Sequence, residues 1–516
     1  MKKSSFYISL FALALGGCWT MAPDYERPQS PVGNDRFNGA GTQVELGAGH
    51  AAFLGWRHFY KDETLCRLMQ QGLENNRDLR VAVLNIEKLA AAYRINRSLF
   101  FPSVNGNASW TRTRTPETVP SNVTGSALRT NNSQAVGLIS YELDIWGRIK
   151  SLNDAAYENY LRAAEVERTV RITLAASIAQ QYYAYSLATE QLEISQKMLA
   201  LAKEYRDIVS ENYNSGLVSE LDFSMAEAQY QQTVDSVEQL KAAKAQAYNA
   251  LQLLVGSQLP ETLVPGKSLT DEALVADLPA GLPSELLTAR PDILAAEHAL
   301  KAANANIGAA RAAFFPSVTL TASAGWAAGE HNELLHRNAR TWQISPSVNL
   351  PIFNGGRLAA ELDVAKLERE VEIANYEKAI QAAFKEVSDE FAVANTIEQR
   401  VAAQDIYLKS EKRRYEIVRD NYDCGNASSL DVILAHQAYF GAQQSALATR
   451  FERVCNKIRF YKALGGGWTA EAIGGNEEIV SAGTEEGQAF EEEFVDQNLV
   501  PTSCEAMAKE SLEDFE

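Results

Sequence analysis

The side chains that could perform catalysis or bind a metal are scattered along this chain of 516 residues. The six histidines share no spacing, and the segment HNELLH (His331–His336) lacks the HExxH order of a helical zinc site. The sequence contains no GxSxG nucleophile motif and no glycine-rich phosphate loop. No CxxC pair occurs among the cysteines at positions 66, 424, 455 and 504. We therefore expect no enzyme, no metal site and no cofactor.

Cys18 has a different setting from the other cysteines. Two lysines precede an apolar run over Phe6–Leu15, which is too short to span a bilayer and is typical of a secretory signal. The sequence LGGC at this point resembles the bacterial lipobox, whose cysteine becomes acylated. We predict a signal peptide over 1–17, and diacylglycerol and an N-acyl chain on Cys18. Trp19, in place of Asp, favours sorting to the outer membrane. A plain signal peptide with a nearby cysteine is the alternative.

The net charge of −18 argues against nucleic acid as a partner, because a phosphate-binding surface needs an excess of Lys and Arg. Most of this charge lies at the C-terminus, where Trp468–Glu516 holds 14 acidic residues and one lysine. We expect this tail to be solvated and without a packed core.

The chain is an internal duplication. A long segment around the sequence NY…G…LD recurs at an offset of 209, and several landmarks recur in the same order. The paired segments are Phe100–Val104 with Phe314–Val318, Leu143–Arg148 with Leu350–Arg357, Asn212–Tyr230 with Asn421–Tyr439, and Asn249–Gly256 with Ile458–Gly465.

Helices dominate each copy. Neither Pro nor Gly occurs over Lys150–Asn212 or Arg357–Asn421, and apolar residues recur there at helical spacing, so each predicts a helix of about 95 Å. Shorter helices are expected over Leu65–Arg97, Leu221–Val255, Pro291–Ala313 and Leu430–Leu464. The lead-in helices stop at Pro102 and Pro316, which cannot continue a helix and which turn the chain into a strand.

Four segments alternate apolar and polar residues, as half-buried strands do. They are Val104–Thr111, Ile139–Ile145, Ser317–Trp326 and Trp342–Leu350. Such strands fit either a sheet on a soluble core or a membrane barrel with a polar lumen. In a membrane, four strands cannot close into a barrel. The backbone N–H and C=O groups of an open sheet edge would then find no hydrogen-bond partner in lipid. The second interpretation therefore requires several chains, and a trimer would supply twelve strands.

The turns that follow the long helices carry Gly216 and Gly425, which we expect to adopt positive φ at the helix ends. SELD and SSLD come next, and each resembles a capping box, with Ser428 as the cap and Asp431 as its partner in the second copy. Asp222 has the same position in the first copy.

These residues resemble the TolC-like outer membrane factors, most closely the lipoprotein branch (NodT/OprM-like) of RND-type efflux systems. The resemblance covers about residues 1–468 and is carried by LGGC, APDYERP (Ala22–Pro28), RPDILAAE (Arg290–Glu297), IGAARAAFFPS (Ile307–Ser317), LPIFNGGR (Leu350–Arg357) and the two NY..G....LD turns. On this basis we expect a lipoprotein signal at 1–17, an N-terminal extended segment at 18–61, repeat 1 at 62–255, a linker at 256–283, repeat 2 at 284–468 and a disordered tail at 469–516.

The resemblance implies a mainly α fold with a transmembrane β-barrel. A homotrimer would form twelve strands in the outer membrane and continue as a long periplasmic α-helical barrel. It implies a passive channel whose partners are a periplasmic adaptor protein, an inner membrane RND-type transporter and outer membrane lipid. Small molecules, drugs or metal ions, would leave the cell through it.

The resemblance also assigns residues at the two tips. It implies that Leu430, Asp431 and Leu434 narrow the tunnel, with three copies of Asp431 attracting cations. It implies adaptor contacts at Gly216, Leu217, Asp222, Gly425 and Asn426. For Asp431, helix capping is the alternative role, and the two are compatible. Two alternatives to the efflux channel remain: a channel for type I protein secretion, and a trimeric coiled-coil tether.

Overall fold

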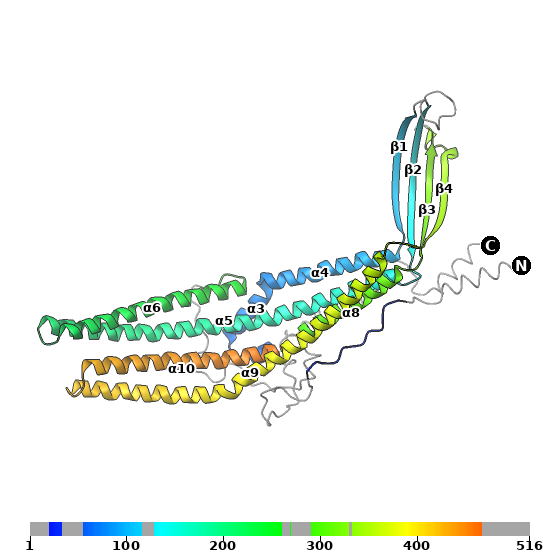
Figure 1. Cartoon of the computed structure of the whole chain (residues 1–516). Helices are drawn as coiled ribbons and strands as arrows, with labels where there is room; N and C mark the ends of the chain where they lie inside the picture. The colour runs from blue at the N-terminus through cyan, green and yellow to red at the C-terminus, as the bar shows by residue number, and fades with distance from the viewer. Residues whose placement is uncertain are drawn as a thin grey trace. The chain divides into compact units, whose positions relative to one another are not determined.

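The computed structural model describes residues 20–32, 55–115, 128–260, 269, 290–329 and 333–466 (Figure 1). The chain divides into two compact units. The first contains 1–29, 84–163 and 294–379, and the second contains 30–83, 164–293 and 380–516. Cys18, most of the 256–283 linker and the 469–516 tail lie outside the described residues.

The two repeats have the same order of elements, as the duplication predicts. Repeat 1 contains α3 (Glu63–Asn75), α4 (Arg77–Arg97), η2 (Ser98–Phe100), β1 (Ser103–Thr115), β2 (Leu128–Leu143), α5 (Arg148–Asn214) and α6 (Glu220–Val255). Repeat 2 contains α8 (Pro291–Ala312), β3 (Ser317–Ala328), η4 (Arg337–Ala339), β4 (Arg340–Asn349), α9 (Arg357–Asp423) and α10 (Ser429–Ala463). Of the predicted N-terminal segment, 20–32 has neither helix nor strand, whereas Trp56–Phe59 forms the short helix α2.

The four strands form one antiparallel sheet in the order β1-β2-β3-β4, so β1 and β4 are its edges (Figure 1). Val104 lies opposite Ile139, Ile139 opposite Ala322, and Ala322 opposite Ile344. Because residues directly opposite each other share a face, the expected apolar faces of all four strands coincide. The strands have 13, 16, 12 and 10 residues, so all four are longer than predicted. Ile145, which we expected in the second strand, lies beyond its end.

Long helical hairpins follow each pair of strands, α5 with α6 and α9 with α10 (Figure 1). Helices α5 and α9 have 67 residues each, which gives each a path of about 100 Å. Their bounds agree with the prediction to within about two residues. None of the helices in the described part of the chain combines the length and the apolar character needed to cross a membrane.

The predicted single helix over Leu65–Arg97 is wrong, because the helix is broken at Asn76. Asn76 has extended backbone angles (φ −64°, ψ 133°). Its side-chain oxygen accepts the backbone N–H groups of Asp78 and Leu79 at 2.9 and 3.0 Å, so it caps α4. Its side-chain nitrogen donates to the carbonyl of Leu254 at 2.8 Å. The break therefore fixes the end of α6 against the junction of α3 and α4.

The main hydrophobic core belongs to the second unit. It brings together α2, α3, the middle of α5, and the C-terminal ends of α6 and α10. Its aromatic side chains pack at their faces and edges, with Phe59 and Tyr461 stacked at 4.2 Å between ring centroids. Burial of these large rings stabilises this unit. Its members include Trp56, Phe59, Tyr60, Leu65, Met69, Tyr182, Tyr183, Leu251, Ile458 and Tyr461.

In the first unit, the small residues of α8 allow close packing. Ala302 and Ala305 are buried against Ala155 of α5. A Cβ atom on Gly308 would lie 2.5 Å from Ser151 Oγ and 2.6 Å from the backbone nitrogen of Ala22. The alanine and glycine pattern of α8 is therefore needed for α5 and the N-terminal segment to approach it closely.

Candidate functional site: the two hairpin tips

The turn between α5 and α6 is a Schellman motif. Gly216 has φ +73°, and its N–H donates to the carbonyl of Tyr213 at 2.9 Å. The N–H of Leu217 donates to the carbonyl of Asn212 at 2.9 Å. These bonds satisfy the last carbonyls of α5 and require the left-handed conformation that glycine adopts most readily.

The turn between α9 and α10 repeats this geometry. Gly425 has φ +77°, and its N–H donates to the carbonyl of Tyr422 at 2.9 Å. The N–H of Asn426 donates to the carbonyl of Asn421 at 2.8 Å. The duplication thus extends to individual hydrogen bonds, with Leu217 in one copy replaced by Asn426 in the other.

Each return helix begins with a full capping box, in agreement with the capping interpretation. Ser428 Oγ accepts the N–H of Asp431 at 3.2 Å, and Asp431 Oδ2 accepts the backbone N–H of Ser428 at 3.0 Å. Ser219 and Asp222 form the same pair of bonds, each at 3.2 Å. The hydrogen bonds from Ser428 lower the pKa of Asp431, so this carboxylate stays ionised over a wide pH range.

The predicted constriction residues lie together on the first turn and a half of α10. Leu430 and Leu434 are exposed in the single chain, and Asp431 is exposed between them. The carbonyl of Leu434 accepts a long hydrogen bond of 3.4 Å from Arg414 Nη2 of α9. At the other tip, Leu217 and Leu221 are more exposed still, at 75% and 69%. Large apolar side chains left in water at both tips are available for contact with another protein.

The two proline corners lie between helix and strand. Pro102 follows η2 and precedes β1, and Pro316 precedes β3. The carbonyl of Pro316 accepts a hydrogen bond from Trp146 Nε1 at 2.9 Å, and the rings of Trp146 and Phe315 lie 4.7 Å apart. This bond joins the proline corner of repeat 2 to the segment that follows β2 in repeat 1.

The sequence did not indicate that the N-terminal segment would be bound along α8. We call residues 20–27 the strap. Arg27 makes a bidentate ion pair with the buried Glu297, with nitrogen–oxygen distances of 3.2 and 2.6 Å. Tyr25 donates its hydroxyl to the same carboxylate at 3.2 Å. The carbonyls of Met21 and Pro23 accept hydrogen bonds from Arg311 and Asn304.

Two of the motifs that carried the family resemblance, APDYERP and RPDILAAE, therefore meet in the fold. A sequence alone gives no signal for this contact, because Arg27 and Glu297 are 270 positions apart. In the second unit, the buried Arg290 of the latter motif donates to the carbonyl of Ala463 at 2.7 Å. It also pairs with Asp292 of α8 and Glu386 of α9 at 2.6 and 2.9 Å. Arg290 therefore joins the end of α10 to α8 and α9.

Comparison with known proteins gives one consistent result. The model of the family described as outer membrane efflux protein matches residues 68–257 and again 282–466. The toluene efflux pump outer membrane protein TtgC of Pseudomonas putida is 38% identical over 469 residues, which cover 91% of this chain and 96% of that protein. The cation efflux system protein CusC of Escherichia coli is 37% identical over 461 residues, which cover 89% and 97%.

A solved structure agrees with these sequence matches. The open state of the MtrE outer membrane channel of Neisseria gonorrhoeae is 34% identical and has a TM-score of 0.78. The match covers 87% of this chain and 99% of that one. This chain therefore shares its fold with that channel.

Proposed function

This chain belongs to the outer membrane efflux protein family, and from that premise we propose that three copies form a passive exit channel of an efflux pump in the outer membrane. A periplasmic adaptor would bind the hairpin tips and connect the channel to an inner membrane RND-type transporter. The energy would come from that transporter, because the chain carries no nucleotide-binding motif.

The observation that carries this proposal is the sheet with two free edges and two chemically different faces. One face holds residues such as Val104, Ile139, Leu320 and Ile344, and the other holds Asn, Ser, Thr and Gln side chains. Edge backbone groups find no hydrogen-bond partner in lipid. Pairing of β1 in one copy with β4 in the next would satisfy them and, with three copies, would close twelve strands around a polar lumen.

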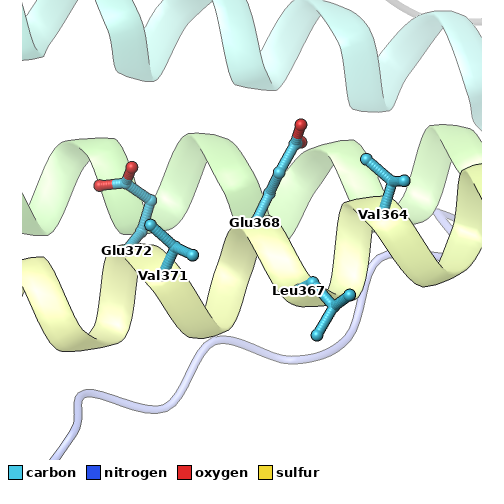
Figure 2. A pocket seen from close by; sticks show the side chains of 5 residues that line it. All are labelled: Val364, Leu367, Glu368, Val371 and Glu372. Atoms are coloured by element: carbon cyan, nitrogen blue, oxygen red, sulfur yellow. The ribbon is translucent and has the colours of Figure 1, made fainter.

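A second feature favours association between copies. Val364, Leu367 and Val371 of α9, which we call the α9 seam, are 54%, 65% and 57% exposed. Their spacing of three and four residues is that of a coiled-coil contact. Figure 2 shows the carboxylates of Glu368 and Glu372 on the same side of α9, beside the apolar side chains. Apolar residues flanked by charges are typical of a helix that packs against another helix.

We propose that acyl chains on Cys18 anchor the channel in the outer membrane. The strap supports this role, because it begins two residues after Cys18 and is bonded to α8 through Glu297, Asn304 and Arg311. The anchor would therefore be joined to the helix that leads into β3.

Cargo selection belongs, in this proposal, to the transporter. TtgC is named for toluene and CusC for cations, yet both align with this chain over almost its whole length. A water-filled duct that serves such different cargoes needs no specific binding site. We therefore propose only a general effect of the tip on ions, through a ring of three Asp431 carboxylates.

Conductance in planar bilayers tests the channel and the ring together. Asp431→Asn removes the charge of the ring, and Asp222→Asn removes a charge from the same type of capping box at the other tip. We expect wild-type trimers to conduct and to prefer cations. Asp431→Asn should reduce that preference, measured as the reversal potential in a salt gradient, whereas Asp222→Asn should leave it unchanged. Equal effects of the two variants would exclude the ring.

Two measurements separate the alternatives. A coiled-coil tether would give no conductance at any salt concentration. A channel for type I secretion would conduct, so it is distinguished by drug and metal sensitivity in cells that lack the gene. Increased sensitivity of these cells, reversed when the gene is returned, would support efflux. Unchanged sensitivity would contradict it.

A further inference from the structure

The two helical hairpins differ at one set of equivalent positions. The offset of 209 relates Arg206, Glu227 and Tyr230 of repeat 1 to Tyr415, His436 and Tyr439 of repeat 2. In both repeats, the first of these residues belongs to the long helix and the other two to the return helix. Each set therefore joins the two helices of its hairpin close to the tip, but with different chemistry.

In repeat 1 the contact is an ion pair and a cation–π contact, both made by one arginine. Arg206 Nη1 lies 3.4 Å from Glu227 Oε2, and its guanidinium lies 4.6 Å from the centre of the Tyr230 ring. The charge of arginine does not change over any physiological pH range. The α5–α6 contact thus has its positive charge on an arginine and contains no histidine.

In repeat 2 the contact is a stack of three rings. Tyr415 of α9 lies 5.1 Å from His436 and 5.9 Å from Tyr439, both on α10, with interplanar angles of 30° and 10°. His436 is half-buried in this stack. Histidine is the one side chain whose ordinary pKa puts its change of charge near neutral pH.

Charged groups on α9, on α10 and on α6, which contacts α10 through Gln229 and Gln437, have partners other than His436. On α9, Arg414 pairs with Glu411 at 3.0 Å. On α10, Asp431 is bonded to Ser428, and on α6, Glu227 is paired with Arg206. None of the ion pairs among the described residues includes His436. An imidazolium here would have the faces of tyrosine rings beside it but no carboxylate to offset its loss of hydration.

We propose that Tyr415, His436 and Tyr439 form a proton-sensitive clamp that holds α9 and α10 together when the imidazole is neutral and loosens when it is protonated. This proposal rests on the channel function above. The clamp makes the second hairpin of the channel the movable one and the first hairpin the fixed one. His436 lies two residues after Leu434, so loosening would displace the predicted constriction residues Leu430, Asp431 and Leu434.

The direction of the pH effect follows from burial. Desolvation lowers the pKa of His436 below the ordinary value of 6.5. The packed hairpin therefore favours the neutral imidazole. Its stabilisation is complete above the ordinary pKa and is lost as the pH falls from there toward the lower pKa of the packed state.

Hydrogen–deuterium exchange of the full-length trimer in detergent tests the clamp directly. Peptides around Tyr415 and Tyr439 are compared with those around Arg206 and Tyr230 at about pH 7.5 and about pH 5.5, which bracket the ordinary pKa of histidine. After correction for intrinsic exchange, we expect a several-fold loss of protection on acidification in the α9–α10 hairpin only. Equal loss in both hairpins, or no loss in either, would overturn the proposal.

Two variants make the assignment specific. His436→Phe keeps a stacked ring but cannot take up a proton, so the loss of protection should disappear. The pair Tyr415→Arg with His436→Glu transfers the repeat 1 contact into repeat 2 and should have the same result if His436→Phe does not fold. His58→Gln, an exposed histidine of α2, should retain the loss. A persistent loss in a folded clamp variant would contradict the role of His436.

Bilayer conductance separates this inference from the channel proposal. A wild-type channel whose open probability rises on acidification, and a His436→Phe channel whose open probability does not, would support both. A conducting wild-type channel without that rise would contradict the clamp alone. Absence of conductance at every pH would refute the channel, while the exchange experiment would still decide whether the clamp exists.

Discussion

Glu297 is the residue on which the attachment of the strap depends most. Burial raises the pKa of this carboxyl. The hydrogen bonds and charges of Arg27 and Lys301 lower the pKa by more than burial raises it, so the net pKa lies below the ordinary 4.5. The ionised carboxylate is therefore favoured in the folded protein. Its contribution to stability is present above the ordinary pKa and is lost as the pH falls below it.

We predict that Glu297→Gln releases the strap. The change removes the charge that Arg27 and Lys301 face, and it should cost about 1–3 kcal/mol, as for a buried charged hydrogen-bonding group. The measurements are the thermal unfolding midpoint in detergent and the rate of chymotrypsin cleavage after Tyr25. Glu26→Gln, an exposed neighbour in the strap, should change neither. An unchanged cleavage rate in Glu297→Gln would show that the strap is held by its other bonds.

Residue-scale features were predictable where they are local. The capping box of Ser428 and Asp431 spans four positions, so its pattern is visible in the sequence and the structure contains it. The constriction and adaptor roles of the tip residues stay predictions. The Glu297 cluster and the stack of Tyr415 with His436 could not be foreseen, because each joins elements whose contact depends on the tertiary fold.

At the scale of elements, helix ends are decided by a few backbone positions. Gly256 ends α6 with φ +69°, and a Cβ there would lie 2.6 Å from the carbonyl oxygen of Asn75 and 3.2 Å from the Cα of Asn76. Gly425 has a similar φ of +77°, but no heavy atom lies within 4 Å of its Cβ position. An alanine would therefore be strained by the backbone conformation at both positions, but it would clash with neighbouring atoms only at Gly256.

We predict that Gly256→Ala destabilises the protein more than Gly425→Ala. Both variants lose about 1–2 kcal/mol of stability because alanine must adopt the left-handed conformation. Only Gly256→Ala also pushes backbone apart at the junction of α3, α4 and α6, where neither side can move freely. Thermal unfolding of the two variants in the same detergent measures the difference. Equal midpoints would show that this junction adjusts without cost.

The elements themselves were largely predictable. Runs of more than sixty residues free of Pro and Gly predicted α5 and α9 within about two residues, and strict alternation predicted the four strands. The break at Asn76 was missed because asparagine is not a helix breaker of the Pro or Gly kind. It ends one helix and caps the next only where its amide nitrogen can also reach the carbonyl of Leu254.

At the scale of the whole molecule, the α9 seam gives a test of assembly. We predict that Leu367→Glu and Val371→Glu together weaken the trimer, because the charges would be buried against a neighbouring helix. Mass measurement of the detergent-extracted protein would show smaller species. Lys366→Gln, on the same helix but off the seam, should leave the trimer intact. A stable trimer in the double variant would place the seam on a surface that no other chain covers.

The duplicated plan was visible in the sequence as four landmarks in one order, and the family model matches once in each half. The need for several chains is a different kind of inference. It follows from the open edges of a four-stranded sheet and not from any residue pattern, so it is independent of the particular side chains on the strands.

The free edges β1 and β4 have a genetic consequence. A chain whose β4 edge is blocked could still offer β1 to a neighbour, so it would enter assemblies and leave each one unclosed. With equal and freely mixing amounts of blocked and normal chains, only about one eighth of trimers would be made of normal chains alone. Such an allele would be dominant, and the steepness of its dose response would count the subunits in the ring.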